Sequence, residues 1–124
     1  MSKWLYLMAG GIAGTFARYV MDGFVHEALG PGFPYGTMAV NWTGCLIIGF
    51  LAALAEEKFI LGTNARLLLM AGFCGAFTTF STLILETANL LRAGENLKAF
   101  FNVALSVLAG YAFFRIGVFV AEII

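Results

Sequence analysis

Four long apolar stretches, separated by short polar loops, occupy almost the whole of this 124-residue chain. A helix needs about 20 consecutive apolar residues to cross a bilayer, so four crossings leave no room for a separate soluble domain. Hydrophobic residues make up 61% of the chain and charged residues only 11%, a composition that a water-exposed surface of this size does not tolerate. The sequence therefore predicts an all-α integral membrane protein: one domain over residues 1–124 with four transmembrane helices.

The limits of these helices follow from the apolar runs and from helix breakers. Gly30-Pro31-Gly32-Phe33-Pro34 separates the first two helices, and Gly62-Thr63-Asn64 offers an N-cap before the third. The first apolar run, Trp4 to Met21, also has the outline of a signal peptide, but small residues at its centre and Arg18 in the same helical register favour a permanent helix. The expected transmembrane helices cover about residues 4–28, 36–55, 65–91 and 99–120.

Positive charges are distributed almost evenly between the two sides of such a protein. Four crossings place both termini and the loop between the second and third helices on one side of the membrane. The positive residues on that side are Lys3, Lys58, Arg66 and Arg115, and those on the other are Arg18, Arg92 and Lys98. The positive-inside rule then sets little preference. We expect either an antiparallel dual-topology dimer of oppositely inserted copies or a single orientation decided by one charge near the first helix.

The third apolar stretch carries glycines and hydroxyl residues near its centre, in Gly72-Phe73-Cys74-Gly75-Ala76-Phe77-Thr78-Thr79-Phe80-Ser81-Thr82. Glycine weakens a helix and Ser or Thr hydroxyls compete for backbone groups, so this pattern predicts a break within residues 75–79. Unwound backbone in a membrane must be buried in protein or line a polar path. Freed carbonyls would suit a small hard cation and the hydroxyls an ion route. Close helix packing through small residues is the alternative.

Other polar residues lie inside the expected helices. Asn41 is an amide in the second helix, where it needs a partner or a polar path. Asn102, Ser106 and Gly110 recur every four residues and so share one face of the fourth helix. Glu86 lies beyond the expected break, where it is either a proton or cation site or, as we favour, a hydrogen-bond acceptor near the interface.

Several other functions are disfavoured by the residues present. The chain has no run of Lys or Arg, so it lacks the charge pattern of a nucleic-acid-binding protein. Cys45 and Cys74 lie inside apolar stretches without disulfide or metal-site spacing, and we interpret both as packing residues. His26 falls in the polar stretch that follows the first apolar run, where a surface role is expected. No nucleophile, base and orienting group assemble, so we expect no enzyme.

Three motifs along the chain resemble the Fluc/CrcB family of fluoride channels. They are Gly10-Gly11-Ile12-Ala13-Gly14 with Arg18-Tyr19, then Gly36-Thr37 with Val40-Asn41-Trp42-Thr43-Gly44, and the stretch from Gly72 to Thr82. The resemblance implies a dual-topology homodimer of four-helix subunits in a bacterial inner membrane, surrounded by lipid. It further implies two antiparallel pores that export fluoride passively and lower cytoplasmic fluoride, with a structural sodium ion at the centre of the dimer interface.

The same resemblance assigns roles to individual residues. Asn41 would donate to fluoride and Phe80, whose ring edge carries positive partial charge, would face the ion. The backbone carbonyls of Gly75 and Thr78 from both subunits would hold the sodium ion, and Arg18 would lie near a vestibule. The remaining residues implied to line the pore are Ser81, Thr82, Leu83, Glu86, Asn102 and Ser106.

This chain departs from the family pattern at a few positions. Leu83 stands where the family usually has a second phenylalanine and offers no ring edge, which puts the second ion position in doubt. An aromatic or hydroxyl residue is common around Asn102 and Gly110; Asn102 could replace a hydroxyl donor, whereas Gly110 cannot.

Two further functions remain open from the sequence. A small multidrug-resistance-type exporter would need an acidic residue deep in the first helix; none precedes Asp22, so proton coupling would fall to Glu86. The second function is that of an accessory subunit that only docks a larger membrane protein. Such a subunit would neither dimerise nor conduct by itself.

Overall fold

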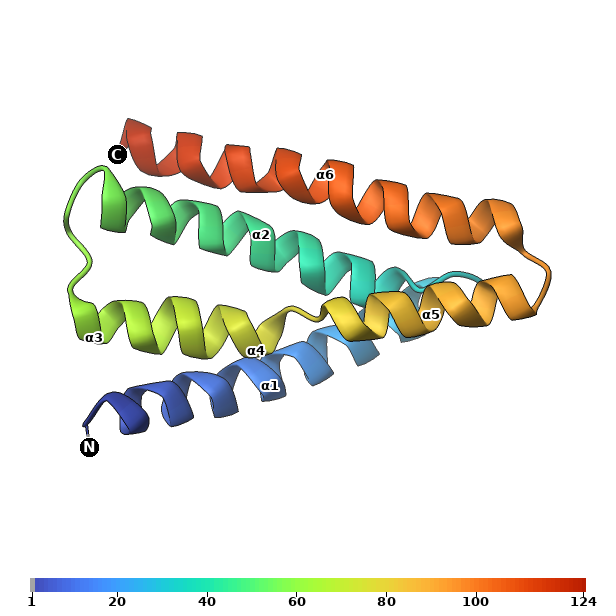
Figure 1. Cartoon of the computed structure of the whole chain (residues 1–124), viewed down its shortest axis with the longest axis horizontal. Helices are drawn as coiled ribbons and strands as arrows, with labels where there is room; N and C mark the ends of the chain where they lie inside the picture. Colours follow the sequence, from blue (N-terminus) through green and yellow to red (C-terminus); the bar gives the residue numbers. More distant parts are fainter. Residues whose placement is uncertain (1) are drawn as a thin grey trace.

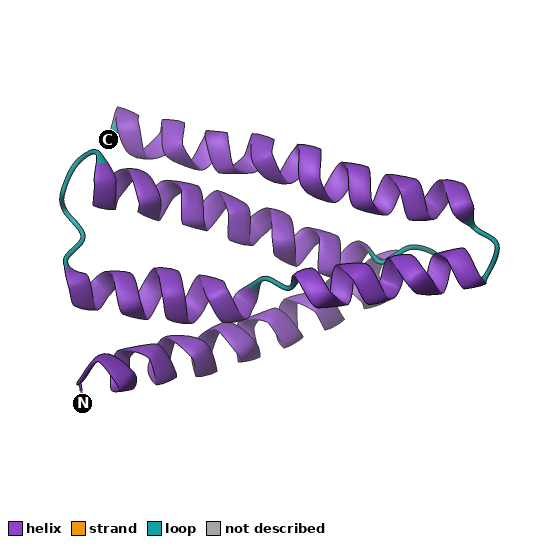
Figure 2. Ribbon diagram, viewed as in Figure 1, coloured by secondary structure: helices purple, strands orange, loops and turns teal. Residues whose placement is uncertain are grey.

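The computed structural model describes residues 2–124 and contains helices and loops but no strand over that range (Figures 1 and 2). The all-α prediction is therefore confirmed. Four long helical elements are α1 (Ser2–Leu29), α2 (Tyr35–Glu56), α5 (Phe80–Arg92) and α6 (Asn96–Ile123). Between α2 and α5 the chain passes through α3 (Thr63–Ala65), the π-helix η1 (Arg66–Cys74) and α4 (Gly75–Phe77).

Within residues 2–124, three helical segments are long and apolar enough to cross a membrane. They are Tyr35–Glu56, Thr63–Arg92 and Asn96–Ile123, the second of which joins α3, η1, α4 and α5. The protein is thus a multi-pass membrane protein. With 28 residues, α1 is as long as α6, but Lys3, Arg18 and Asp22 lie within it and its apolar character falls below that of the other three segments.

The two ends of the bundle carry different parts of the chain. Both termini and the loop between α2 and α3 lie at one end, and the α1–α2 and α5–α6 connections lie at the other (Figure 1). At this second end, α1 is followed by Gly30, whose N–H donates to the His26 carbonyl at 2.8 Å and whose φ of 84° turns the chain away from the helix. Gly94, with φ of 79°, closes α5: its N–H donates to the Leu91 carbonyl at 3.0 Å, and the N–H of Glu95 donates to the Leu90 carbonyl at 2.9 Å. These glycines are C-caps.

Glycines allow two helix pairs to approach closely. α1 packs against η1 and α4, while α2 packs along α6. A Cβ atom at Gly10 of α1 would collide with the Leu68 carbonyl of η1, and one at Gly117 of α6 would collide with the Leu46 carbonyl of α2. Because each contact is made by backbone, packing here depends on the absence of a side chain.

Trp42 ties α2 to α6 near the middle of the bundle. Its indole Nε1 donates to the Leu105 carbonyl at 3.1 Å, and its ring stacks on Phe113 with the centroids 5.5 Å apart. An indole N–H inside an apolar bundle needs such a partner. The interaction fixes the part of α2 that carries the neighbouring Asn41.

Candidate functional site

The third apolar segment is interrupted at two threonines. Thr78 (φ −91°, ψ 157°) and Thr79 (φ −150°, ψ 113°) are extended, so α4 stops at Phe77 and α5 begins at Phe80. The interruption is visible as a short loop in the middle of the bundle (Figure 2). It occupies the last two residues of the expected range 75–79, and Gly75–Phe77 remain helical.

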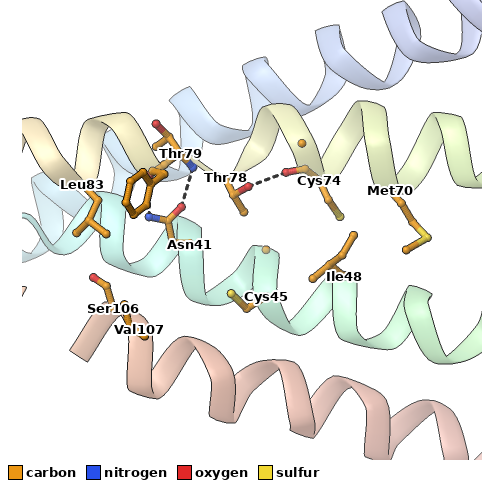
Figure 3. Close-up of a pocket in the computed structure, with 13 residues that line it drawn as sticks. Asn41, Cys45, Ile48, Met70, Cys74, Thr78, Thr79, Leu83, Ser106 and Val107 are labelled. Atoms are coloured by element: carbon orange, nitrogen blue, oxygen red, sulfur yellow. Dashed lines mark hydrogen bonds between the residues drawn. The ribbon is translucent and has the colours of Figure 1, made fainter. Parts of the chain in front are cut away.

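Asn41 of α2 holds the interruption through both atoms of its amide. Its Nδ2 donates to the Thr79 carbonyl at 3.1 Å, and its Oδ1 accepts the Thr79 N–H at 2.8 Å (Figure 3). In a continuous helix that N–H would bond to the carbonyl four residues earlier, which belongs to Gly75. Asn41 therefore takes the donor that would otherwise satisfy Gly75.

Thr79 has a second role as the N-cap of α5. Its Oγ1 accepts the Thr82 N–H at 3.3 Å and lies 3.0 Å from the Thr82 hydroxyl. A continuous helix would instead direct the Thr82 N–H to the Thr78 carbonyl. As a result, no hydrogen bond from a residue in the range 2–124 reaches the carbonyl oxygen of Gly75 or of Thr78.

A groove of about 390 Å³ lies beside these free carbonyls. It brings together six of the predicted site residues: Asn41, Gly75, Thr78, Phe80, Leu83 and Ser106. Phe80 is 73% exposed in the single chain, whereas Leu83 is buried at 5%. The hydroxyl of the buried Ser106 has no hydrogen-bond partner among the described residues.

Two more predicted residues lie on another side of α5. Thr82 and Glu86 are four residues apart and share the face turned towards α1 and α2. The hydroxyl of Thr37 donates to Glu86 Oε2 at 3.0 Å, while Glu86 Oε1 is buried without a partner among the described residues. Glu86 also lines a pocket of about 260 Å³ at the end of the bundle with His26, which is exposed.

A small chamber lies between α1, α2 and the start of α5. Its volume of about 10 Å³ is close to the minimum that holds a single water molecule. The residues that line it are Arg18, Asp22, Thr37, Val40, Thr79 and Thr82. The Nε of Arg18 donates to the Ala76 carbonyl at 3.0 Å, so Arg18 reaches the break directly.

The other predicted residues are placed apart from the groove. Asn102 is 1% exposed and donates to the Thr87 hydroxyl at 3.0 Å, which pairs α5 with α6. Ser81 is exposed on the surface of the single chain. Sequence reasoning gave no individual role to Thr37 or Thr79. Thr37 could have been found because it lies one helical turn before Asn41, and Thr79 because it precedes a helix as an N-cap residue.

Side chains of the described residues offer no conventional metal site. No group of three or more His, Cys, Asp or Glu that could hold a metal ion occurs within residues 2–124. Cys45 and Cys74 are free thiols. At the break itself, the carbonyl oxygens of Gly75 and Thr78 accept no hydrogen bond from the described residues.

Comparison with known proteins gives a consistent result. The family model described as CrcB-like protein, Camphor Resistance (CrcB), matches residues 5–118. A protein from Methylocella silvestris is 47% identical over 107 residues, which cover 85% of this chain and 82% of the relative. A protein from Chlorobaculum tepidum is 46% identical, with 99% of this chain and 97% of the relative covered. A third, from Maridesulfovibrio salexigens, is 41% identical, with 90% of this chain and 89% of the relative covered. Each is named "Fluoride-specific ion channel FluC".

Proposed function

Because the chain belongs to the CrcB-like family, whose members are fluoride channels rather than enzymes, we propose that it conducts fluoride selectively and passively. In a bacterial inner membrane this activity would export fluoride and lower its cytoplasmic concentration. Two relatives that this chain matches over 82% and 97% of their length are named fluoride-specific ion channels, which supports fluoride as the ion.

The arrangement around Asn41 is the observation that carries this proposal. Fluoride is strongly hydrated, so a pore must replace its water with good hydrogen-bond donors. One N–H of the Asn41 amide is bonded to Thr79, which leaves the other available to an anion in the groove. The ring of Phe80 and the unpartnered hydroxyl of Ser106 line the same groove, and aromatic ring edges carry positive partial charge.

The polar residues of α5 would extend the route towards one end of the bundle. Ser81, Thr82 and Glu86 follow the break along this helix, and Thr37 binds the Glu86 carboxylate. We assign Asn102 to the support of this route, since it binds Thr87 on the same helix.

The exposure of the break in a single chain supports a second copy as the partner. Gly75 and Phe80 are exposed, and Thr78 is only half-buried. Unwound backbone in hydrocarbon is tolerated only where protein or a polar path covers it. An antiparallel homodimer would cover this surface, and the four-to-three distribution of positive residues is compatible with insertion in both directions. This assembly counts α1 as the fourth crossing.

The free carbonyls of Gly75 and Thr78 fit a structural sodium ion. Both are oxygen donors without a hydrogen bond among the described residues, as the ligands of a small hard cation should be. Two carbonyls from each subunit would hold the ion at the dimer centre. When bound, it would supply a fixed positive charge beside the route.

The rival proposal, a proton-coupled exporter of cationic compounds, depends on Glu86. Its carboxylate accepts a hydrogen bond from Thr37 and lies with Asn89 and Glu95 at a pocket near the bundle end. An exporter of this type would move its substrate against a gradient when a proton gradient is imposed. A passive channel would not.

Efflux from liposomes containing the purified protein tests the proposal. A fluoride electrode would record release under a potassium-ionophore clamp, with a matched chloride trial. We expect fast fluoride release and no chloride release. Folded protein that releases neither ion, or releases both equally, would refute a selective fluoride channel.

A further inference from the structure

Among residues 2–124, Arg18 makes the only side-chain hydrogen bond to a carbonyl of α4. Its Nε donates to the Ala76 carbonyl at 3.0 Å from a residue 58 positions earlier in the chain. In a continuous helix the Ala76 carbonyl would accept the N–H of Phe80, but the break at Thr78 and Thr79 removes that donor. Arg18 thus replaces a lost backbone hydrogen bond.

The position of Arg18 also suits its charge. The helical segment from Thr63 to Phe77 ends at the break, and the carbonyl end of a helix carries negative partial charge. The guanidinium lies at this end and is half-buried. It further lines the water-sized chamber with Thr79 and Thr82, which belong to the other side of the break.

Two side chains from different helices therefore hold the break. Asn41 of α2 binds Thr79, while Arg18 of α1 binds Ala76. Between them, the Ala76 carbonyl is satisfied, while the carbonyls of Gly75, Phe77 and Thr78 accept no hydrogen bond from the described residues. The two side chains therefore hold open a stretch of backbone whose carbonyls can accept a cation.

We infer that Arg18 is a positioning residue, which acts through the directed hydrogen bond of its Nε to hold the break in the shape that leaves its carbonyls, those of Gly75 and Thr78 among them, free for the cation. Attraction of anions by its charge is not needed for this role. The inference rests on the proposed function, because sodium at the break and fluoride conduction are its consequences.

Three substitutions separate the hydrogen bond from the charge. Arg18→Gln places an amide nitrogen at the same distance along the side chain as Nε, and so keeps a donor but no charge. Arg18→Met has a similar length with neither donor nor charge. Arg18→Lys keeps the charge on a nitrogen one atom further out. Liposome efflux at low and high salt would be measured for each, beside thermal unfolding of the purified dimer with and without sodium.

If Arg18 positions the break, Arg18→Gln retains conduction within about twofold of wild type and Arg18→Met loses about fivefold or more, the size expected for the loss of one neutral hydrogen bond. Sodium should raise the unfolding temperature of wild type and Arg18→Gln, but not of Arg18→Met. Equal loss in Gln and Met with full activity in Lys, most marked at low salt, would overturn the inference in favour of charge.

Failure of the proposed function would be distinguishable from failure of this inference. A wild-type protein that releases no fluoride contradicts the channel, whereas the sodium-dependent unfolding series still tests Arg18. If Arg18→Met does not fold, the comparison of Gln with Lys decides between hydrogen bond and charge.

Discussion

Replacing the Asn41 amide by a carboxylate should stop fluoride passage. Asn41→Asp keeps an oxygen that accepts the Thr79 N–H, now bonded at 2.8 Å. It replaces Nδ2 by a second oxygen, 3.1 Å from the Thr79 carbonyl, so the N-cap side of the break loses a hydrogen bond. It also removes the N–H that we assign to fluoride.

The size of the effect follows from electrostatics. Two like charges about 4 Å apart repel by about 4 kcal/mol at an effective dielectric constant of about 20. A barrier raised by this amount slows passage about a thousandfold, since about 1.4 kcal/mol corresponds to a factor of ten. Loss of the neutral hydrogen bond adds about 1 kcal/mol of destabilisation.

Fluoride efflux from liposomes would measure the effect at matched protein content. Asn64→Asp is the control, because Asn64 is exposed in α3 and the same chemical change there adds the same charge away from the groove. Lys58→Ala, in the α2–α3 loop, should likewise change efflux little. Full conduction by a folded Asn41→Asp variant would remove Asn41 from the pore.

Three further outcomes are expected. Gly10→Ala should lower the thermal unfolding temperature, with a cost of about 1–3 kcal/mol from overpacking, because the new methyl meets the Leu68 carbonyl. Gly11→Ala meets nothing within 4 Å and should leave that temperature unchanged or slightly raised; equal effects would contradict the packing assignment. Leu83→Phe should increase fluoride efflux by adding a ring edge beside the groove, and unchanged efflux in a folded variant would separate this position from the ion. Complete exchange of sodium for a large organic cation should abolish fluoride efflux, and undiminished efflux would argue against the structural cation.

Features encoded by local pattern were predictable from the sequence. The apolar runs gave helical membrane segments, and Gly30 closes α1 because it takes a φ of 84°. Glycines and threonines near the centre of the third segment indicated a break, and two extended threonines are present there. These properties depend on neighbours in sequence, and composition and spacing therefore report them.

Features that depend on distant residues were not predictable in this way. The break is placed at Thr78 and Thr79 by the Asn41 amide, 38 residues from Thr79, and by Arg18, 58 residues from Ala76. The π-helical form of η1 was also not predictable, because its nine mostly apolar residues show no pattern that distinguishes a π-helix from an α-helix. Periodicity likewise grouped Asn102 with Ser106, yet Asn102 is buried against Thr87 while Ser106 lines the groove.

The contact between Trp42 and α6 gives this protein an intrinsic optical reporter. The chain has two tryptophans, and the other, Trp4, is 57% exposed near the start of α1. After Trp4→Phe, all indole fluorescence would come from a ring that is hydrogen-bonded to the Leu105 carbonyl and adjacent in sequence to Asn41. Its emission wavelength would then follow the separation of α2 and α6 in a native bilayer without any attached dye.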